Sequence, residues 1–334
     1  MASTQTEYPA EGYFVLPAEF LVNRSALGRS FCTKLEDRPL VVTLPRAVQD
    51  SAKRDGWVIA EPEWYRLPDN AVGGEWGHAM SWRTGEPESA MVLRLRLAFA
   101  SESDAQELAS DLEHGHGCRL QPWWEHVHEW ITATGNHWWS TARQPYRSHV
   151  GEIWIDRDEQ ARHVSLNHYQ EINVMMHQQP GDPEPGLSGA HFETILGLVA
   201  SGQAPPLELA LLRQAEWSAA LGDNREAVIV AGTAAEIALT KLIRSSVEAV
   251  AQSIADALLD KYRMLGNLID LANRLGVELP NGATASLAKP RNDAVHSGTH
   301  PSDKEMYSAI SITRKIVSLS SPLSELGLDG PGEA

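Results

Sequence analysis

Four polar or charged side chains fall within six positions of the stretch KPRNDAVHSG, which runs from Lys289 to Gly298. Histidine titrates near neutral pH, so His296 can serve as an acid or as a base. Arg291 offers a planar guanidinium group whose donors match the oxygens of a phosphate. Metal-independent RNA cleavage needs such groups: a base for the 2′-hydroxyl, an acid for the leaving oxygen and a cation for the developing charge.

The spacing of these residues sets a geometric condition on the site. Arg291 and His296 are five positions apart, roughly 140° around a helix, so one helix does not present both on the same face. A cleft between two copies of the chain solves this, because each copy supplies an arginine and a histidine. Asn292 lies one turn before His296 and is expected to orient it or to bind phosphate. Asp293 is expected to be a solvated or capping residue.

Glu236 lies among alanine, isoleucine and leucine on a largely apolar predicted helix. A buried carboxylate is costly unless it is paired, and Arg291 is the candidate partner. Such a pair would hold the arginine in a cleft. The alternatives are a purely structural ion pair and a glutamate on the surface of the bundle.

These residues belong to a C-terminal region whose pattern is helical. Pro205 and Pro206 precede the first helix, and Gly222-Asp223-Asn224 ends it and caps the next. Five or six helices with short connections are typical of an up-down bundle. The sequence predicts helices over 207–221, 225–243, 253–265, 268–275, 283–289 and 303–319.

The N-terminal half has a different composition. All but one of the eleven tryptophans precede residue 180. Short apolar runs predict strands, a Ser-Glu-Ser-Asp cap predicts a helix, and together they indicate an α+β domain over 1–180. A segment rich in proline and glycine predicts a linker over 181–205, before the all-α bundle at 206–320 and a flexible tail at 321–334. The strands are expected at 13–16, 40–44 and 90–99, the helix at 105–113 and a hairpin at 151–165.

Three segments of the C-terminal region resemble the HEPN domain superfamily, most of all its Apea-like or RiboL-PSP-HEPN subgroup. They are ALGDNREAVIVAGTAAEIALTKLI, MLGNLIDLANRLGVELP and RNDAVHSG. The last matches the family pattern of arginine, a polar residue, three further residues and histidine. The resemblance covers roughly 206–320. It departs from the family at Pro290, where members usually have leucine or another apolar residue.

The resemblance implies a helical bundle that dimerises. In active members, arginine and histidine from two copies line a shared cleft and cut RNA without a metal. Here this implies Arg291 and His296 as catalytic residues, with Asn292 and Glu236 in support. Many members have lost activity and act as binding modules, so a non-catalytic domain that binds RNA, a nucleotide or a protein is the alternative. An ordinary helix end is a third interpretation.

Other clusters carry less chemistry. The histidines of His114-Gly115-His116-Gly117-Cys118 and Glu125-His126-Val127-His128-Glu129 are two positions apart, which does not match zinc-ligand spacing. His296 and His300 have suitable spacing, but Gly298 lies between them. The tryptophans predict core packing, with a recognition surface as the alternative; they are Trp123, Trp124, Trp130, Trp138 and Trp139.

Composition limits the function classes. The net charge of −16 disfavours broad nonspecific binding to nucleic acid, so an RNA substrate needs a local basic cleft. Two cysteines, with no expected signal peptide or membrane span, indicate a cytoplasmic protein. We expect no cofactor and no metal. The leading hypothesis is a homodimeric endoribonuclease of toxin or anti-phage (abortive-infection) type, with a possible protein trigger at the N-terminal domain.

Overall fold

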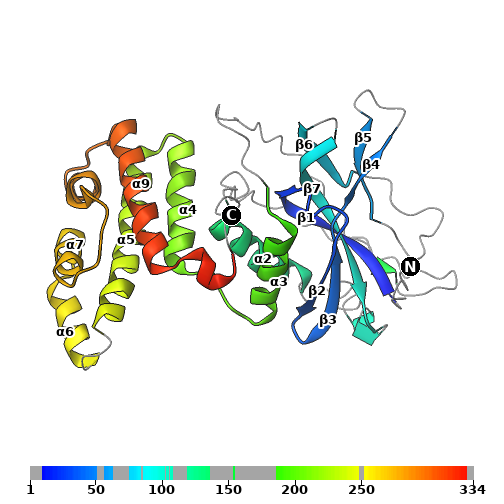
Figure 1. Ribbon diagram of the computed structural model, residues 1–334, viewed down its shortest axis with the longest axis horizontal. Helices are drawn as coiled ribbons and strands as arrows, with labels where there is room; N and C mark the ends of the chain where they lie inside the picture. Colours follow the sequence, from blue (N-terminus) through cyan, green and yellow to red (C-terminus); the bar gives the residue numbers. More distant parts are fainter. Residues whose placement is uncertain are drawn as a thin grey trace. The chain divides into compact units, whose positions relative to one another are not determined.

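The computed structural model divides into two compact units, with the boundary between Ala204 and Pro205; Thr132–Thr134 also group with the second unit. The first unit holds the strands and the second consists of helices (Figure 1). This order agrees with the predicted sheet-containing part followed by a helical part. The structure describes residues 10–50, 56–62, 75–83, 86–101, 103–104, 106–107, 119–135, 153–154, 186–247 and 252–328.

The sheet of the first unit is antiparallel, in the order β2-β3-β7-β1-β8, with β6 also paired to β7. A separate ribbon pairs β4 with β5. The described strands of the first unit are β1 (Ala10–Asn23), β2 (Ser30–Leu35), β3 (Arg38–Thr43), β4 (Arg46–Gln49), β5 (Trp57–Ala60), β6 (Gly77–Arg83), β7 (Glu86–Phe99) and β8 (Ile153–Trp154).

The three strands predicted from apolar runs are confirmed as parts of β1, β3 and β7. The alternating run at 90–99 predicted a half-buried strand, and β7 lies inside the sheet because β1 pairs on one side and β3 and β6 pair on the other. Of the predicted hairpin at 151–165, β8 is described, and it pairs with β1. Most of the helix predicted at 105–113 lies outside the described residues.

Two helices, α2 (Leu120–Thr134) and α3 (Gly189–Ala200), pack on the sheet through aromatic side chains. The Phe20 ring of β1 has its centroid 5.5 Å from that of Trp124 on α2 and 5.4 Å from that of Phe192 on α3. Trp123 and Trp130 are also buried. Core packing therefore accounts for these three tryptophans, while Trp138 and Trp139 lie outside the described residues.

Helix α3 corrects the predicted linker at 181–205. The Ser188 side chain caps it by accepting a hydrogen bond from the backbone N–H of His191. Phe192 and Ile195 are fully buried. Pro183, Pro185 and Gly186 lie before the cap, and the apolar residues after it pack as a helix. The predicted tail at 321–334 likewise begins with ordered residues, because a short 3₁₀ helix follows and Leu328 is buried.

The second unit follows the predicted helical pattern with shifted boundaries, and the piece predicted at 283–289 is a π-helix that continues as an α-helix to His296. Asp223 caps the second of its helices by accepting from the Glu226 N–H, and Ser302 forms a capping box with Glu305. Its elements are α4 (Leu207–Ala220), α5 (Asn224–Ser246), α6 (Gln252–Lys261), α7 (Leu265–Arg274), the π-helix η2 (Thr284–Ala288), α8 (Lys289–His296), α9 (Asp303–Ser320) and the 3₁₀ helix η3 (Leu323–Leu326).

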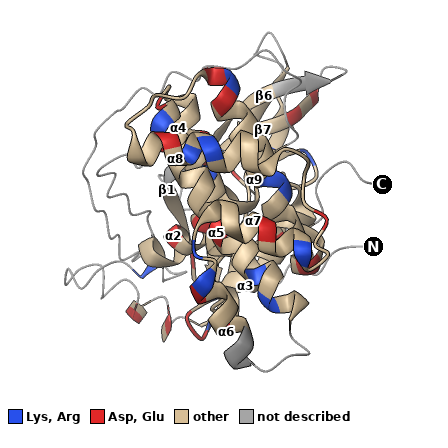
Figure 2. Ribbon diagram, turned by 90° about the vertical axis from the view of Figure 1, so that its left-hand side faces the viewer, with Lys and Arg blue, Asp and Glu red and all other residues tan. Residues whose placement is uncertain are grey.

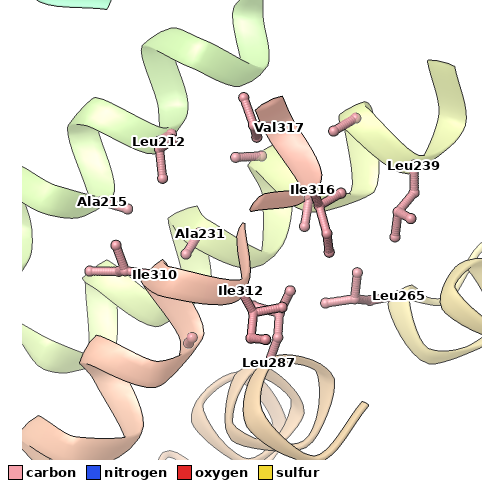
Figure 3. Packing of buried hydrophobic residues seen from close by; sticks show 14 of the residues in the cluster. Leu212, Ala215, Ala231, Leu239, Leu265, Leu287, Ile310, Ile312, Ile316 and Val317 are labelled. Atoms are coloured by element: carbon pink, nitrogen blue, oxygen red, sulfur yellow. The ribbon is translucent and has the colours of Figure 1, made fainter. Parts of the chain in front are cut away.

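Helix α5 lies at the centre of this unit and packs against α4, α7, α8 and α9. Its buried face is rich in alanine, which lets neighbouring helices approach closely. Figure 3 shows Leu212 of α4, Leu239 of α5, Leu265 of α7, Leu287 of η2 and Ile316 of α9 pointing into one core. The described helices include none with the length and apolarity to cross a membrane.

A buried carboxylate joins three of these helices. Glu208 of α4 is 0% exposed, and its Oε1 accepts from Lys241 Nζ of α5 at 2.6 Å and from Ser321 Oγ, after α9, at 2.5 Å. Burial raises the pKa of Glu208, but the bonds from Lys241 and Ser321 outweigh it and hold the pKa below its usual value. Glu208 is therefore ionised at neutral pH and contributes to stability.

We expect Glu208→Gln to lower the free energy of unfolding by about 2 kcal/mol at pH 7, because charge-assisted hydrogen bonds are lost. The folded pKa is depressed, so this contribution is present above the unfolded pKa and disappears as pH falls through the folded pKa. Urea denaturation at pH 7 and at pH 3 measures both effects. The matched control is Glu278→Gln, at an exposed position. Equal losses in the two variants at pH 7 would contradict the prediction.

Candidate functional site

The stretch KPRNDAVHSG folds as α8 and the turn that follows it. The π-helix η2 runs directly into α8, and the backbone N–H of Lys289 donates to the carbonyl of Thr284, five residues earlier. Pro290 is buried in the first turn of α8. Proline lacks an N–H and is tolerated where the regular helical ladder is already interrupted. The π turn thus explains the proline at which the sequence departs from the HEPN pattern.

Arg291 and Glu236 form the ion pair predicted from the sequence. Nη2 of Arg291 lies 3.0 Å from Oε1 of Glu236, which α5 supplies. Both side chains are largely buried, with exposed fractions of 17% and 24%. Nη1 of Arg291 donates to Oδ1 of Asn292 at 3.2 Å. Asn292 therefore orients the arginine, whereas the sequence predicts that it orients His296 or binds phosphate.

Gly232 is a site residue that sequence reasoning missed. A Cβ atom at this position of α5 would lie 2.6 Å from Cγ of Arg291, which is closer than atoms can approach. Gly232 is one helical turn before Glu236, so a single face of α5 provides both the space for the arginine stem and the carboxylate for its head. A signal was present, because glycine inside a long helix costs about 1 kcal/mol relative to alanine and needs a reason.

The energetics of the pair favour a positional role over a stabilising one. Burial raises the pKa of Glu236 above its ordinary value, and the charge of Arg291 lowers it only in part. The unfavourable effect of removing water from the Glu236 carboxylate thus exceeds the favourable effect of the Arg291 charge. The ion pair is therefore a weak source of stability. Nε of Arg291 is buried and has no hydrogen-bond partner among the described residues. A buried donor of this kind is explained by strain, by a bound water molecule or ion, or by a catalytic role.

His296 is the last residue of α8 and is exposed. In the part of the chain that the structure describes, no hydrogen bond or ion pair joins its side chain to Arg291. The helix turns after it: the N–H of Ser297 donates to the carbonyl of Asp293, and Gly298 has a φ of 64°. One chain therefore presents an anchored arginine that faces α5 and an exposed histidine at the end of the same helix.

The candidate metal ligands outside KPRNDAVHSG are described only in part. Among the described residues, no group of three His, Cys, Asp or Glu side chains could hold a metal ion. The loop from His114 to Cys118 lies outside those residues. A ring nitrogen of His126 lies 2.8 Å from the carbonyl oxygen of Gln203, which also accepts from Trp130. His126 thus belongs to the packing of the first unit.

Charges of both signs are interspersed along the helices of the second unit (Figure 2). The described helices thus offer no broad basic face for nonspecific binding of a polyanion. A ligand with phosphate groups would instead have to meet a local arrangement such as Arg291 with its neighbours.

Comparisons with protein-family models, with curated proteins and with solved structures found no match. The function is therefore inferred from the geometry of the site itself and from the resemblance of its motif to the HEPN pattern.

Proposed function

We propose that the helical unit is a HEPN-like domain that cleaves RNA without a metal ion. His296 transfers protons, and Arg291 stabilises the negative charge that develops on the phosphate. The 2′-oxygen attacks the adjacent phosphorus, the bond from phosphorus to the 5′-oxygen breaks, and the proton of the 2′-hydroxyl is balanced by one delivered to the leaving oxygen. The products are a 2′,3′-cyclic phosphate and a 5′-hydroxyl.

One observation carries this proposal: Arg291 is held in one position by specific contacts within the chain. Glu236 and Asn292 fix two of its nitrogen atoms, and Gly232 leaves room for its stem. Such preorganisation is what electrostatic stabilisation of a transition state requires. An ordinary solvated helix end would need none of these contacts.

A homodimer would complete the site. Arg291 faces α5 while His296 is exposed, so the two groups of one chain lie on different sides of α8. A second copy packed along this helix would bring its histidine to the part of the Arg291 side chain that stays exposed, as twofold symmetry allows. The sheet-containing unit would then receive a protein trigger, as expected for toxin or anti-phage systems.

A second candidate function is a non-catalytic module that binds RNA, a nucleotide or a protein. The observation in its favour is that Nη1 and Nη2 of Arg291 already bond within the chain. In this case the motif would maintain a surface and His296 would contact the ligand without chemistry.

The test is incubation of the purified full chain with a mixed-sequence RNA in excess EDTA. We expect cleavage products that carry 2′,3′-cyclic phosphate and 5′-hydroxyl ends. Fluorescence anisotropy on the same RNA measures binding in parallel. Binding without cleavage would overturn the nuclease proposal and favour the binding module. The absence of both binding and cleavage would contradict the nuclease proposal and also RNA as the ligand of a binding module.

A further inference from the structure

The N-terminal turn of α5 contacts the far end of α8. Nε of Arg225 donates to the carbonyl oxygen of Ala294 at 3.1 Å. The neighbouring Asn224 donates from Nδ2 to the carbonyl of Pro301 at 3.1 Å and to Oδ1 of Asp303 at 2.7 Å. Two consecutive side chains of α5 thus hold the last turn of α8 and the end of the loop that follows.

The carbonyl of Ala294 needs this donor. The last carbonyls of a helix lack intrahelical partners. Here the N–H groups of Ser297 and Thr299 both donate to the carbonyl of Asp293, at 3.0 and 3.3 Å. Within the described chain, the donor to the Ala294 carbonyl is therefore the Arg225 guanidinium. A positive charge at the C-terminal end of a helix also interacts favourably with the helix dipole.

The two ends of α8 are fixed by the same helix. Arg225 precedes Gly232 by seven residues, about two turns, so both lie on one face of α5. Gly232 and Glu236 seat Arg291 near the start of α8, and Arg225 seats the turn that carries His296. Helix α5 thus fixes the two ends of α8, and with them Arg291 and the backbone of His296, within one chain.

We infer that Arg225 is a positioning residue for His296, acting through the last turn of α8. The catalytic consequence of this inference rests on the proposed function. The hydrogen bond from Arg225 to the carbonyl of Ala294, which we call the clamp, does not depend on that function. The exposed His296 has no hydrogen bond of its own among the described residues that would fix its orientation. The position of its backbone is therefore what Arg225 controls.

The experiment compares the full-length wild type with Arg225→Met, which removes the donor but keeps the length, and Arg225→Lys, which keeps a donor and the charge. The control is Arg244→Met, at an exposed position near the other end of α5. Hydrogen exchange of the backbone amides at 297–300 is measured in each, together with kcat and KM for RNA cleavage.

We expect Arg225→Met to speed exchange of the Ser297 and Thr299 amides about tenfold, to lower kcat about tenfold and to leave KM within about twofold. Arg225→Lys should restore most of both losses, and Arg244→Met should resemble the wild type. Unchanged exchange in Arg225→Met overturns the clamp. Faster exchange with unchanged kcat, or a raised KM with unchanged kcat, overturns the positioning role. An inactive wild type would refute the proposed nuclease, and the exchange result would still decide the clamp.

Discussion

Replacing His296 with alanine is expected to slow RNA cleavage in EDTA by about 10²- to 10⁴-fold, which is the usual contribution of a general acid or base. The side chain is exposed, so its removal leaves the core intact and the variant should unfold at the wild-type temperature. Rates are measured with a single labelled RNA at saturating enzyme, so that loss of chemistry is separated from loss of binding.

The matched control is His300→Ala, because His300 is also exposed but lies beyond Gly298 and outside α8. This variant should keep wild-type activity. Equal activity of His296→Ala and the wild type would sink the assignment of His296, and an equal fall in both histidine variants would point to a general effect of this surface.

His296→Ala, combined with a second variant, tests whether two chains share one site. Arg291→Gln should be inactive on its own, as should His296→Ala. If the arginine of one copy works with the histidine of the other, mixing the two variants regenerates one intact site in each mixed dimer. Random exchange of subunits then restores up to about a quarter of the wild-type activity. Zero recovery after confirmed exchange would place both groups in one chain.

The elements of the second unit were predictable because helical periodicity and caps are local signals. Asp223 and Ser302 mark helix starts through side chains that bond to backbone groups only three residues away. The pair of Glu236 and Arg291 was predictable for a different reason: a carboxylate on an apolar helix needs a partner, and Arg291 of KPRNDAVHSG was the candidate cation.

Contacts between distant segments that do not follow from pairing opposite charges were not predictable. Whether Asn292 turns toward His296 or Arg291 depends on the rotation of α8 against α5, which packing decides. The contact of Arg225 with Ala294 spans 69 positions of the sequence and uses a backbone carbonyl, so no pairing of residue types announces it. Helix α3 was missed because proline and glycine before the cap outweighed the apolar residues after it.

Gly232→Ala is expected to lower RNA cleavage by about 10²-fold, comparable to the loss of one donor to a developing oxyanion. The added Cβ would lie 2.6 Å from Cγ of Arg291, and the clash is with the stem of the side chain, so the guanidinium must leave Glu236. Fold stability should not fall in proportion, because alanine is favoured over glycine inside a helix by about 1 kcal/mol.

Gly266→Ala is the matched control, because a Cβ at this position of α7 would meet nothing within 4 Å. Both substitutions gain helix propensity, and only the one on α5 should lose activity. The two positions therefore separate the geometry of the arginine from any general effect of stiffening a helix. Full activity in Gly232→Ala would show that the seat of Arg291 on α5 is not needed for cleavage.

A double variant makes the mechanism of this loss specific. If Gly232→Ala acts only by displacing Arg291, then adding it to Arg291→Gln should cost no further activity, since residues that act as a unit are not additive. A further fall in the double variant would mean that the added methyl group disturbs more than the arginine. Because α5 holds both ends of α8, such a fall would be expected if His296 moved as well, and faster hydrogen exchange at Ser297 and Thr299 would reveal it.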